Sequence, residues 1–454
     1  MARSATLFAC SSCGHESPKW HGRCPGCGEW NTFVEERRVA TPRTGGGAAG
    51  GARRSARALE PVRLGEVQAP RVERLRTGIG ELDRVLGGGV VPGSLVLIGG
   101  SPGIGKSTLT SGALGNLAAA GRKVLYVSGE ESAAQVKLRA QRLGPAALTV
   151  PIVAETDLDS VLATIEAERP EVCVVDSVQV LYDPAMAGSP GSVGQVREVA
   201  GRLMRVAKER GVAVILVGHV TKEGSIAGPR VLEHLVDCVL SFEGERERTY
   251  RTLRSLKNRF GSTSEVGVFE MNEHGLVEVE DASARFVNEA TRAPGSVVLC
   301  AMEGSRPLLV EVQALVAPSE LVPPRRVANG VDRNRLALVL AVLARHGGAA
   351  LGGSDVFVSV AGGVRVDEPG ADLAIALALA SAAKGTALGG EQPLAAFGEL
   401  GLTGELRHVG HTDRRMAEAG KFGLTTVLHP GERLSTLRQA LAAAGARSAP
   451  ARAA

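Results

Sequence analysis

The sequence predicts an α/β protein with a parallel central sheet and helices on both faces, preceded by a small cysteine-rich unit and followed by an α+β domain. Three observations support this prediction. A glycine-rich turn joins an apolar run to an Ala/Leu-rich segment at 94–120. Apolar runs then alternate with helical patterns as far as His219, as in a parallel sheet covered on both faces. Four cysteines stand in two pairs near the start of the chain.

The length of 454 residues is enough for about three domains of ~150 residues each. A net charge of +4 is too small to indicate a partner. The longest apolar run, 336–344, falls well short of the ~18 residues of a membrane span, so we expect a cytoplasmic protein with no membrane segment. We divide the chain into five segments, taken in turn below: 1–34, 35–60, 61–285, 286–440 and 441–454.

The glycine-rich turn matches a phosphate-binding motif. Within SLVLIGGSPGIGKST, the spacing is that of the pattern G-x-x-x-x-G-K-[ST]. The backbone N–H groups of such a turn surround a polyphosphate, the lysine reaches its β- and γ-phosphates and the serine hydroxyl binds Mg²⁺. We therefore assign binding of ATP and Mg²⁺ to the whole turn, namely Gly100, Ser101, Pro102, Gly103, Ile104, Gly105, Lys106, Ser107 and Thr108.

Polar residues follow three of the predicted strands. Asp176 ends VCVVD and matches a carboxylate that holds nucleotide-bound Mg²⁺ through water. Glu130 and Glu131 follow VLYVSG, and one of them is placed to orient or deprotonate the attacking water. His219 ends VAVILVGH and is either a sensor of the γ-phosphate or a structural histidine. Because ligands bind at the carboxyl ends of parallel strands, we expect these residues in one site.

The paired cysteines predict a structural zinc site in segment 1–34. Cys10, Cys13, Cys24 and Cys27 form two C-x-x-C knuckles with a short connection. A unit of about 30 residues with so few apolar side chains needs a bound metal to fold. Disulfides are the alternative, and a cytoplasmic location disfavours them.

The next segment, 35–60, has no apolar pattern and is rich in glycine, alanine and arginine. We expect a flexible basic linker, either a solvated tether or a segment that also contacts a phosphate backbone. The tail, 441–454, is rich in alanine and arginine and is expected to fray.

The chain closely resembles the bacterial RadA (Sms) family of RecA-like DNA-repair ATPases. The resemblance rests on TGIGELDRVLGGG, the phosphate-binding turn, YVSGEES, VVDS, GHVTKEG, IAGPRVLEH and KNRFG, in that order. It implies a RecA-like ATPase core over 61–285, with Glu130 as the catalytic carboxylate. It also implies that Lys257 and Arg259 reach the nucleotide of a neighbouring subunit in a hexameric ring.

A cation supplied by a neighbour would stabilise the charge that spreads over the transferred phosphoryl group, and would make hydrolysis depend on assembly. Without the family, Lys257 and Arg259 are equally compatible with an exposed strand of alternating charge.

Two segments rich in Gly, Ser and Pro follow the strands that end at Asp176 and His219. They span 182–197 and 222–233. In RecA-like proteins the corresponding loops bind single-stranded DNA, so we assign DNA contacts to Arg197, Lys222 and Arg230. The alternative is a pair of ordinary surface loops.

Segment 286–440 reads as an α+β domain and is similar to the peptidase domain of Lon, as expected for the RadA family. Lon-type proteolysis needs a serine nucleophile and a lysine base. Gly370 and Asp413 stand at those two places, so we expect an inactive protease used as a scaffold. Its basic residues are compatible with a DNA-facing or subunit-facing surface and with a solvated face: Arg365, Arg407, Arg414 and Arg415.

Together these features predict an ATP-driven motor that binds single-stranded and branched DNA and promotes branch migration beside the RecA recombinase. A nucleotide-gated switch without translocation and an ATP-dependent protease are the alternatives.

Overall fold

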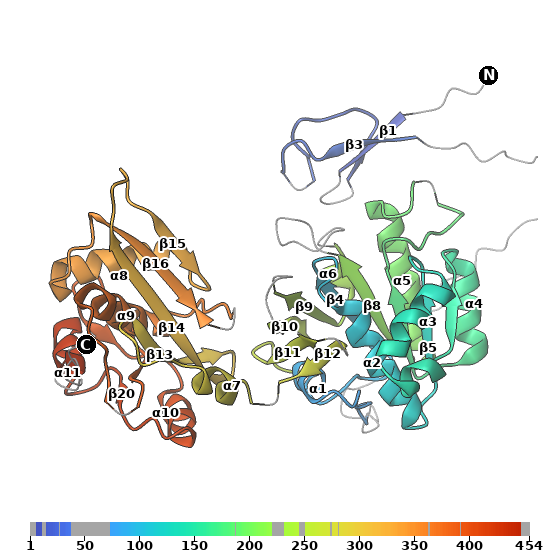
Figure 1. Cartoon of the computed structure of the whole chain (residues 1–454). Coiled ribbons are helices and arrows are strands. Elements are labelled where there is room, and N and C mark those ends of the chain that lie inside the picture. Colours follow the sequence, from blue (N-terminus) through green and yellow to red (C-terminus); the bar gives the residue numbers. More distant parts are fainter. Residues whose placement is uncertain are drawn as a thin grey trace, which may run out of the picture.

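The structure is a computed structural model with two α/β domains beside each other and a small N-terminal unit of strands (Figure 1). It describes residues 6–10, 15–26, 28–37, 73–186, 188–219, 231–244, 250–272, 275–279, 281–361, 364–390 and 392–445.

The N-terminal unit is a three-stranded antiparallel sheet in the order β2-β1-β3. Its strands are β1 (Thr6–Cys10), β2 (Glu16–Ser17) and β3 (Phe33–Arg37). Its described core consists of Cys10, Cys24 and Phe33. So small an apolar core agrees with the expectation that this unit needs a metal.

The central sheet of the next domain has, among the described residues, the strand order β12-β11-β10-β9-β4-β8-β7-β5-β6. Strands β9, β4, β8, β7, β5 and β6 run parallel, and β9 to β12 form an antiparallel meander. The strands are β4 (Leu95–Gly100), β5 (Val124–Ser128), β6 (Ile152–Ala154), β7 (Val172–Asp176), β8 (Ala213–His219), β9 (Cys238–Glu243), β10 (Tyr250–Asn258), β11 (Val266–Asn272) and β12 (Gly275–Glu278).

The predicted parallel sheet is thus correct for only part of this domain. From β9 to β12, the described residues contain no helix between successive strands, and each strand pairs antiparallel with the one before it.

Helices cover both faces of this sheet, as predicted. Along β4, Val96 and Ile98 pack into one hydrophobic cluster with α1, α2 and α3, while Leu95 and Leu97 pack into another with α4, α5 and α6. This alternation follows from the period of two in a strand. The helices are α1 (Gly80–Leu86), α2 (Lys106–Ala119), α3 (Ala133–Arg142), η2 (Pro145–Thr149), α4 (Leu158–Glu168), α5 (Val193–Arg210) and α6 (Val231–Leu235).

Helix α5 begins inside the segment predicted to be a loop. The loop expected over 182–197 ends at Ser192, and Arg197 lies exposed on the second turn of the helix. The glycine and serine residues before the helix favoured a loop in the prediction. The helical spacing of the buried apolar residues indicates the helix instead: Val196, Val199, Ala200 and Leu203.

The C-terminal domain has a six-stranded mixed sheet in the order β15-β16-β14-β13-β17-β20, with a separate β18–β19 pair. Its strands are β13 (Ser296–Glu303), β14 (Arg306–Pro318), β15 (Arg326–Asn329), β16 (Ser354–Val360), β17 (Ala395–Ala396), β18 (Glu399–Leu400), β19 (Leu406–Arg407) and β20 (Val427–Leu428). Its helices are α7 (Ala282–Asn288), α8 (Arg333–Val342), a π turn (Leu343–Gly347), η5 (Pro369–Ala371), α9 (Asp372–Lys384), α10 (Thr412–Lys421) and α11 (Leu437–Gly445).

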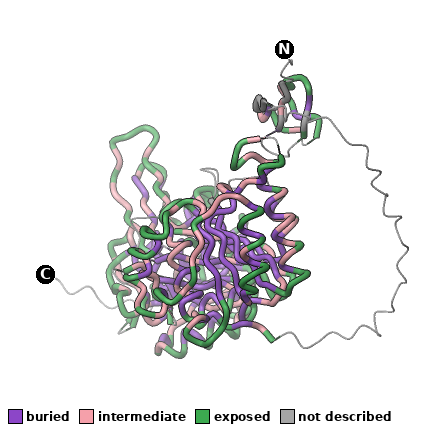
Figure 2. The backbone as a smooth tube through the Cα atoms, turned by 90° about the vertical axis from the view of Figure 1, so that its right-hand side faces the viewer, coloured by how far each residue is buried: buried purple, intermediate pink, exposed green. Residues whose placement is uncertain are grey.

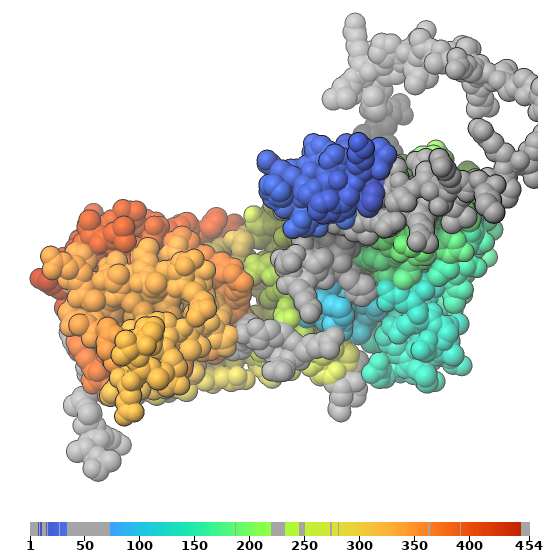
Figure 3. Space-filling view, turned by 90° about the horizontal axis from the view of Figure 1, so that it is seen from above, coloured from blue at the N-terminus to red at the C-terminus, as the bar shows by residue number. Residues whose placement is uncertain are grey.

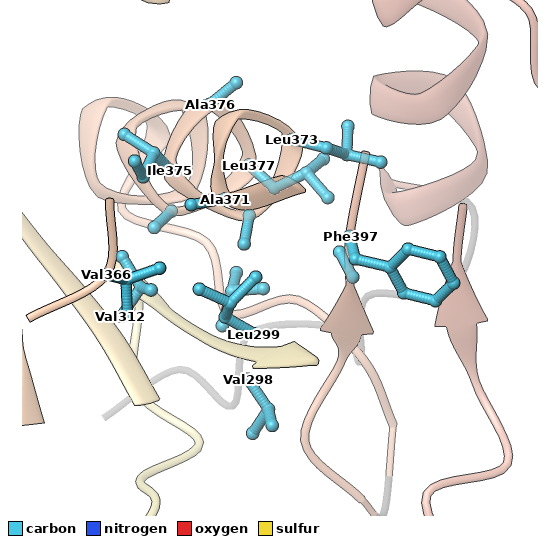
Figure 4. Close-up of a cluster of buried hydrophobic side chains, with 14 of the residues drawn as sticks. Val298, Leu299, Val312, Val366, Ala371, Leu373, Ile375, Ala376, Leu377 and Phe397 are labelled. Atoms are coloured by element: carbon cyan, nitrogen blue, oxygen red, sulfur yellow. The ribbon is translucent and has the colours of Figure 1, made fainter. Parts of the chain in front are cut away.

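Helix α9 forms the centre of this domain. Its residues from Asp372 to Ser381 are all buried, and Figure 4 shows the helix lying over the strand that carries Leu299. Buried residues run through the interior and exposed ones lie on the outer turns (Figure 2). A helix apolar on all sides is expected only where neighbours cover it on all sides.

Candidate nucleotide site

The phosphate-binding turn connects β4 to α2 and uses left-handed backbone that favours glycine. Gly103 has φ +76° and Gly105 has φ +116°. A Cβ built at Gly105 would lie 2.9 Å from Met271 Cε, so a side chain there would also meet β11. Helix α2 starts at Lys106 without a side-chain cap, as is common for a helix whose N-terminus binds an anion.

A cavity of about 470 Å³ opens at this turn. Its walls come from the phosphate-binding turn and from the carboxyl ends of β5 and β7, together with α3 and β11. The lining residues are Pro102, Gly103, Gly105, Lys106, Ser107, Thr108, Ser128, Glu130, Glu131, Arg139, Asp176 and Met271. The structure therefore brings the predicted Glu130 and Asp176 to the predicted phosphate-binding residues.

Lys106 is buried within its own turn. Its ammonium donates hydrogen bonds to the carbonyl oxygens of Gly100 at 2.8 Å and Ser101 at 3.1 Å. Burial lowers the pKa of Lys106, and the carboxylates of Asp176 and Glu130 oppose this effect. A cation held at the cavity by backbone carbonyls is suited to bind a phosphate oxygen.

Asp176 ends β7 and is buried beside Tyr126. The Tyr126 hydroxyl donates a hydrogen bond of 2.6 Å to Asp176 Oδ2. Burial, and then the Asp176 charge, raise the pKa of Tyr126, so this hydroxyl stays a donor. The carboxylate is thus oriented by a neutral donor at the edge of the cavity, where a nucleotide-bound cation would lie. Asp176 therefore fits its predicted role at Mg²⁺.

The two adjacent glutamates have different partners. Glu131 forms an ion pair with Arg139, and Arg139 also donates a hydrogen bond of 2.9 Å to the Tyr126 hydroxyl. Glu130 accepts a hydrogen bond from the hydroxyl of Ser177. The guanidinium of Arg139 occupies Glu131, whereas a neutral hydroxyl holds Glu130 at the cavity, so Glu130 is the better candidate to activate water.

Tyr126, Arg139 and Ser177 were not predicted from the sequence. Ser177 follows Asp176 directly in VVDS, and this position at the end of the same strand is a sequence signal for a site residue. Arg139 lies in α3, which begins just after Glu131, and no local motif indicates that its guanidinium lines the cavity.

Lys257 and Arg259 lie apart from this cavity. The Lys257 ammonium donates to the carbonyl oxygens of Glu233 at 2.7 Å and Val236 at 2.8 Å. Burial, and then Arg259, lower the pKa of Lys257. Arg259 pairs with Asp237 at 3.0 Å, and its side chain is 53% exposed. Neither side chain lines the cavity of its own chain.

The other predicted site residues are only partly described. His219 ends β8 directly opposite Gly100 in the sheet, but its side chain is not among those that the structure describes. Lys222 and Arg230 lie outside the described residues altogether.

In the N-terminal unit, Cys10 and Cys24 are buried together, while Cys13 and Cys27 lie outside the described residues. The Gly26 N–H donates a hydrogen bond of 3.3 Å to Cys24 Sγ, and the Cys10 thiol donates one of 3.1 Å to Thr32 Oγ1. A backbone N–H donor beside sulfur stabilises a thiolate, so Cys24 and the neighbouring Cys10 fit the metal site expected from the spacing.

The C-terminal domain has an ion pair beside the place expected for a protease serine. A Cβ built at Gly370 would lie 3.1 Å from both Arg415 Nη1 and Glu368 Oε2. Arg415 forms an ion pair with Glu368 at 2.5 Å and donates a hydrogen bond of 2.6 Å to the carbonyl oxygen of Cys300. Asp413 is exposed on α10.

The expectation that Arg415 belongs to a basic surface is wrong. Its side chain is 2% exposed, because the carboxylate of Glu368 and the ring of Phe397 hold it inside the domain.

The fold and this cavity define a P-loop ATPase. Residues 60–225 match the family model described as AAA domain, and residues 8–35 match the model described as rubredoxin metal binding domain. Among the described residues, no helix has the length and apolar character to cross a membrane.

Curated relatives identify the family. The chain is 48% identical over 96% of its length to the DNA repair protein RadA of Bacillus subtilis, covering 94% of that protein. It is 49% identical to the DNA repair protein RadA of Brucella abortus, over 93% of this chain and 91% of the relative. It is also 49% identical to the DNA repair protein RadA of Pseudomonas aeruginosa, over 95% of this chain and 94% of that relative. The chain belongs to the DNA repair protein RadA family.

Proposed function

We propose that this ATPase is a motor that binds single-stranded DNA, hydrolyses ATP with Mg²⁺ and promotes branch migration of recombination intermediates beside the RecA recombinase. Four cysteines would hold Zn²⁺ in the N-terminal unit. The names of the relatives support a role in DNA repair.

The register of the central sheet is the observation that carries the proposal. Gly100 pairs with His219, and Ser128 pairs with Asp176. The phosphate-binding turn therefore lies at the same sheet edge as the carboxyl ends of β5, β7 and β8, and the segments 182–192 and 220–230 follow β7 and β8 in the chain. A change at the γ-phosphate could be passed through these strand ends to the DNA-binding segments, and a motor needs such a connection between its nucleotide and its DNA.

The positions of Lys257 and Arg259 support a nucleotide site shared between subunits. Both lie outside the cavity of their own chain, so they can act on a nucleotide only if a neighbour presents one. A closed ring in which every subunit donates these cations to the next is the simplest such assembly, and we propose a hexamer.

DNA binding is proposed for Arg197 on α5 and for Lys222 and Arg230 in the segment between β8 and α6. These basic residues suit phosphate contacts, which do not depend on base sequence. The exposed position of Arg197 is compatible with this role.

The C-terminal domain is proposed to be a Lon-like scaffold without peptidase activity. Gly370 supplies no nucleophile, and the Arg415–Glu368 ion pair lies against it. These two facts disfavour the protease alternative.

The proposal is tested by strand displacement on a labelled branched DNA with a single-stranded arm, with and without ATP. We expect displacement that needs ATP and is lost in Lys106→Ala, since that variant lacks the phosphate ligand. Displacement without ATP, or none under any condition beside active ATP hydrolysis, would contradict the motor.

A further inference from the structure

Lys257 and Arg259 lie in the segment between Arg254 and Ser264, and both ends of this segment contact the C-terminal domain. Strands β13 and β14 form a hairpin whose tip, 303–306, we call the hairpin tip. In Figure 3 the C-terminal domain (orange and red) lies against yellow-green residues of the neighbouring domain. The contacts of the hairpin tip fall on both sides of Lys257 and Arg259 in the chain.

The first contact is an ion pair on β10, before Lys257. Arg254 Nη1 lies 2.6 Å from Glu303 Oε2, and the side chain of Glu303 is 11% exposed. Burial raises the pKa of the Glu303 carboxyl, and the charge of Arg254 opposes this. Arg254 also pairs with Glu243 of β9 at 3.3 Å. This pair links β10 to the hairpin tip, and removing one partner of a largely buried pair leaves the other charge uncompensated.

The second contact lies beyond Arg259, between β10 and β11. The Ser305 N–H donates 2.9 Å to the carbonyl oxygen of Ser264, and its hydroxyl donates to Glu265. A Cβ built at Gly304, which has φ +60°, would overlap the Ser264 carbonyl. The turn of the hairpin can approach this closely only because residue 304 is glycine.

The third contact ties the same hairpin tip to α1 and β11. Arg306 lies 2.6 Å from Glu81 Oε2, and the side chain of Glu81 is 2% exposed. Glu81 also accepts a hydrogen bond of 2.9 Å from the Val268 N–H. At the other end of α1, Asn258 Nδ2 donates 3.3 Å to the Val85 carbonyl.

We propose that Arg254 and Glu303 are positioning residues for ATP hydrolysis, through which the C-terminal domain holds Lys257 and Arg259 in place for the nucleotide of the neighbouring subunit. Contacts on both sides of this short segment leave it little freedom to shift. Misplacement of a catalytic group by about 1 Å can cost on the order of 100-fold in rate. The inference rests on the proposed shared site, because positioning matters only if these cations act there.

Charge reversal tests the ion pair. In Arg254→Glu and in Glu303→Arg we expect kcat for DNA-stimulated ATP hydrolysis to fall about tenfold or more, with KM for ATP little changed. The double variant restores an ion pair, and its kcat should return to within about threefold of the wild type. Arg210→Glu is the matched control, because Arg210 pairs with Glu166 on the outer surface and should leave kcat unchanged.

A mixed assembly separates positioning from a general structural defect. Lys106→Ala subunits cannot use their own nucleotide but retain Lys257 and Arg259. Arg254→Glu subunits retain their own cavity. Mixing the two should restore hydrolysis above either variant alone, since the first supplies well-placed cations to the second. Full activity of both charge reversals alone, or no recovery on mixing, would overturn the inference.

A second mixture distinguishes failure of the inference from failure of the proposed function. Arg259→Ala subunits mixed with Lys106→Ala subunits should recover activity if the site is shared. Recovery here but not with Arg254→Glu rejects only the positioning role. Absence of recovery in both mixtures rejects the shared site itself, and the inference with it.

Discussion

At the scale of single residues, Glu130 and Glu131 show how adjacent side chains can be given different roles. Arg139 neutralises Glu131, while Ser177 holds Glu130 with a neutral hydroxyl. The sequence allowed either glutamate to be the general base, and the family resemblance favoured Glu130. The ion pair with Arg139 now adds a physical reason, one that depends on how α3 packs and could not be predicted from local sequence.

We predict that Glu130→Gln lowers kcat for ATP hydrolysis by about 10²–10³-fold while nucleotide binding persists, because the amide cannot accept the proton of water. Steady-state kinetics and binding of a fluorescent ATP analogue measure the two effects. Glu131→Gln is the matched comparison and should have a much smaller effect on kcat. Equal losses in both variants would contradict the assignment.

Tyr126→Phe should weaken Mg²⁺-dependent nucleotide binding and reduce the free energy of unfolding by about 1 kcal/mol. The reason is that Asp176 loses its oriented donor and stays buried. Titration with Mg²⁺ at fixed ATP, alongside thermal unfolding, checks both effects. An unchanged Mg²⁺ requirement would mean that Tyr126 does not orient Asp176.

At the scale of elements, the phosphate-binding turn was predictable because its chemistry is local. Glycine at 103 and 105 follows from the left-handed backbone of the turn, and Lys106 follows from the start of α2. The antiparallel meander from β9 to β12 was not predicted, because strand direction depends on which neighbours pair and not on the pattern within a strand.

Gly105→Ala should abolish nucleotide binding while leaving the fold largely intact. The residue has φ +116° and a Cβ would meet Met271, so the turn must change its shape. Isothermal titration with ATP and circular dichroism provide the two readouts. Gly121→Ala also replaces a left-handed glycine, but one with open space around it, and should bind ATP normally.

The buried Arg415–Glu368 pair should stabilise the C-terminal domain only while both partners are present. Arg415→Met leaves Glu368 largely buried without its cation, and we expect a loss of about 3–5 kcal/mol in the free energy of unfolding. Arg365→Met removes an exposed pair with Asp367 and should change it by less than about 1 kcal/mol. Denaturant titration measures both, and equal effects would contradict the role of burial.

At the scale of the whole molecule, composition and motifs predict the order of the units along the chain but not the contact between the two α/β domains. The hairpin tip and the segment around Ser264 belong to different domains, and no sequence pattern in either one indicates that they meet. Contacts of this kind depend on the final shapes of two domains, so only the structure shows that Glu303 lies against Arg254.

The most direct test of the motor is steady-state ATP hydrolysis with and without single-stranded DNA, for the wild-type chain, Lys106→Ala and Arg259→Ala. We predict several-fold stimulation by DNA in the wild type and its loss in both variants, since one removes the phosphate ligand and the other a cation for the neighbouring site. Hydrolysis indifferent to DNA would contradict the motor and favour a nucleotide-gated switch. Unchanged activity in Arg259→Ala would exclude that arginine from catalysis.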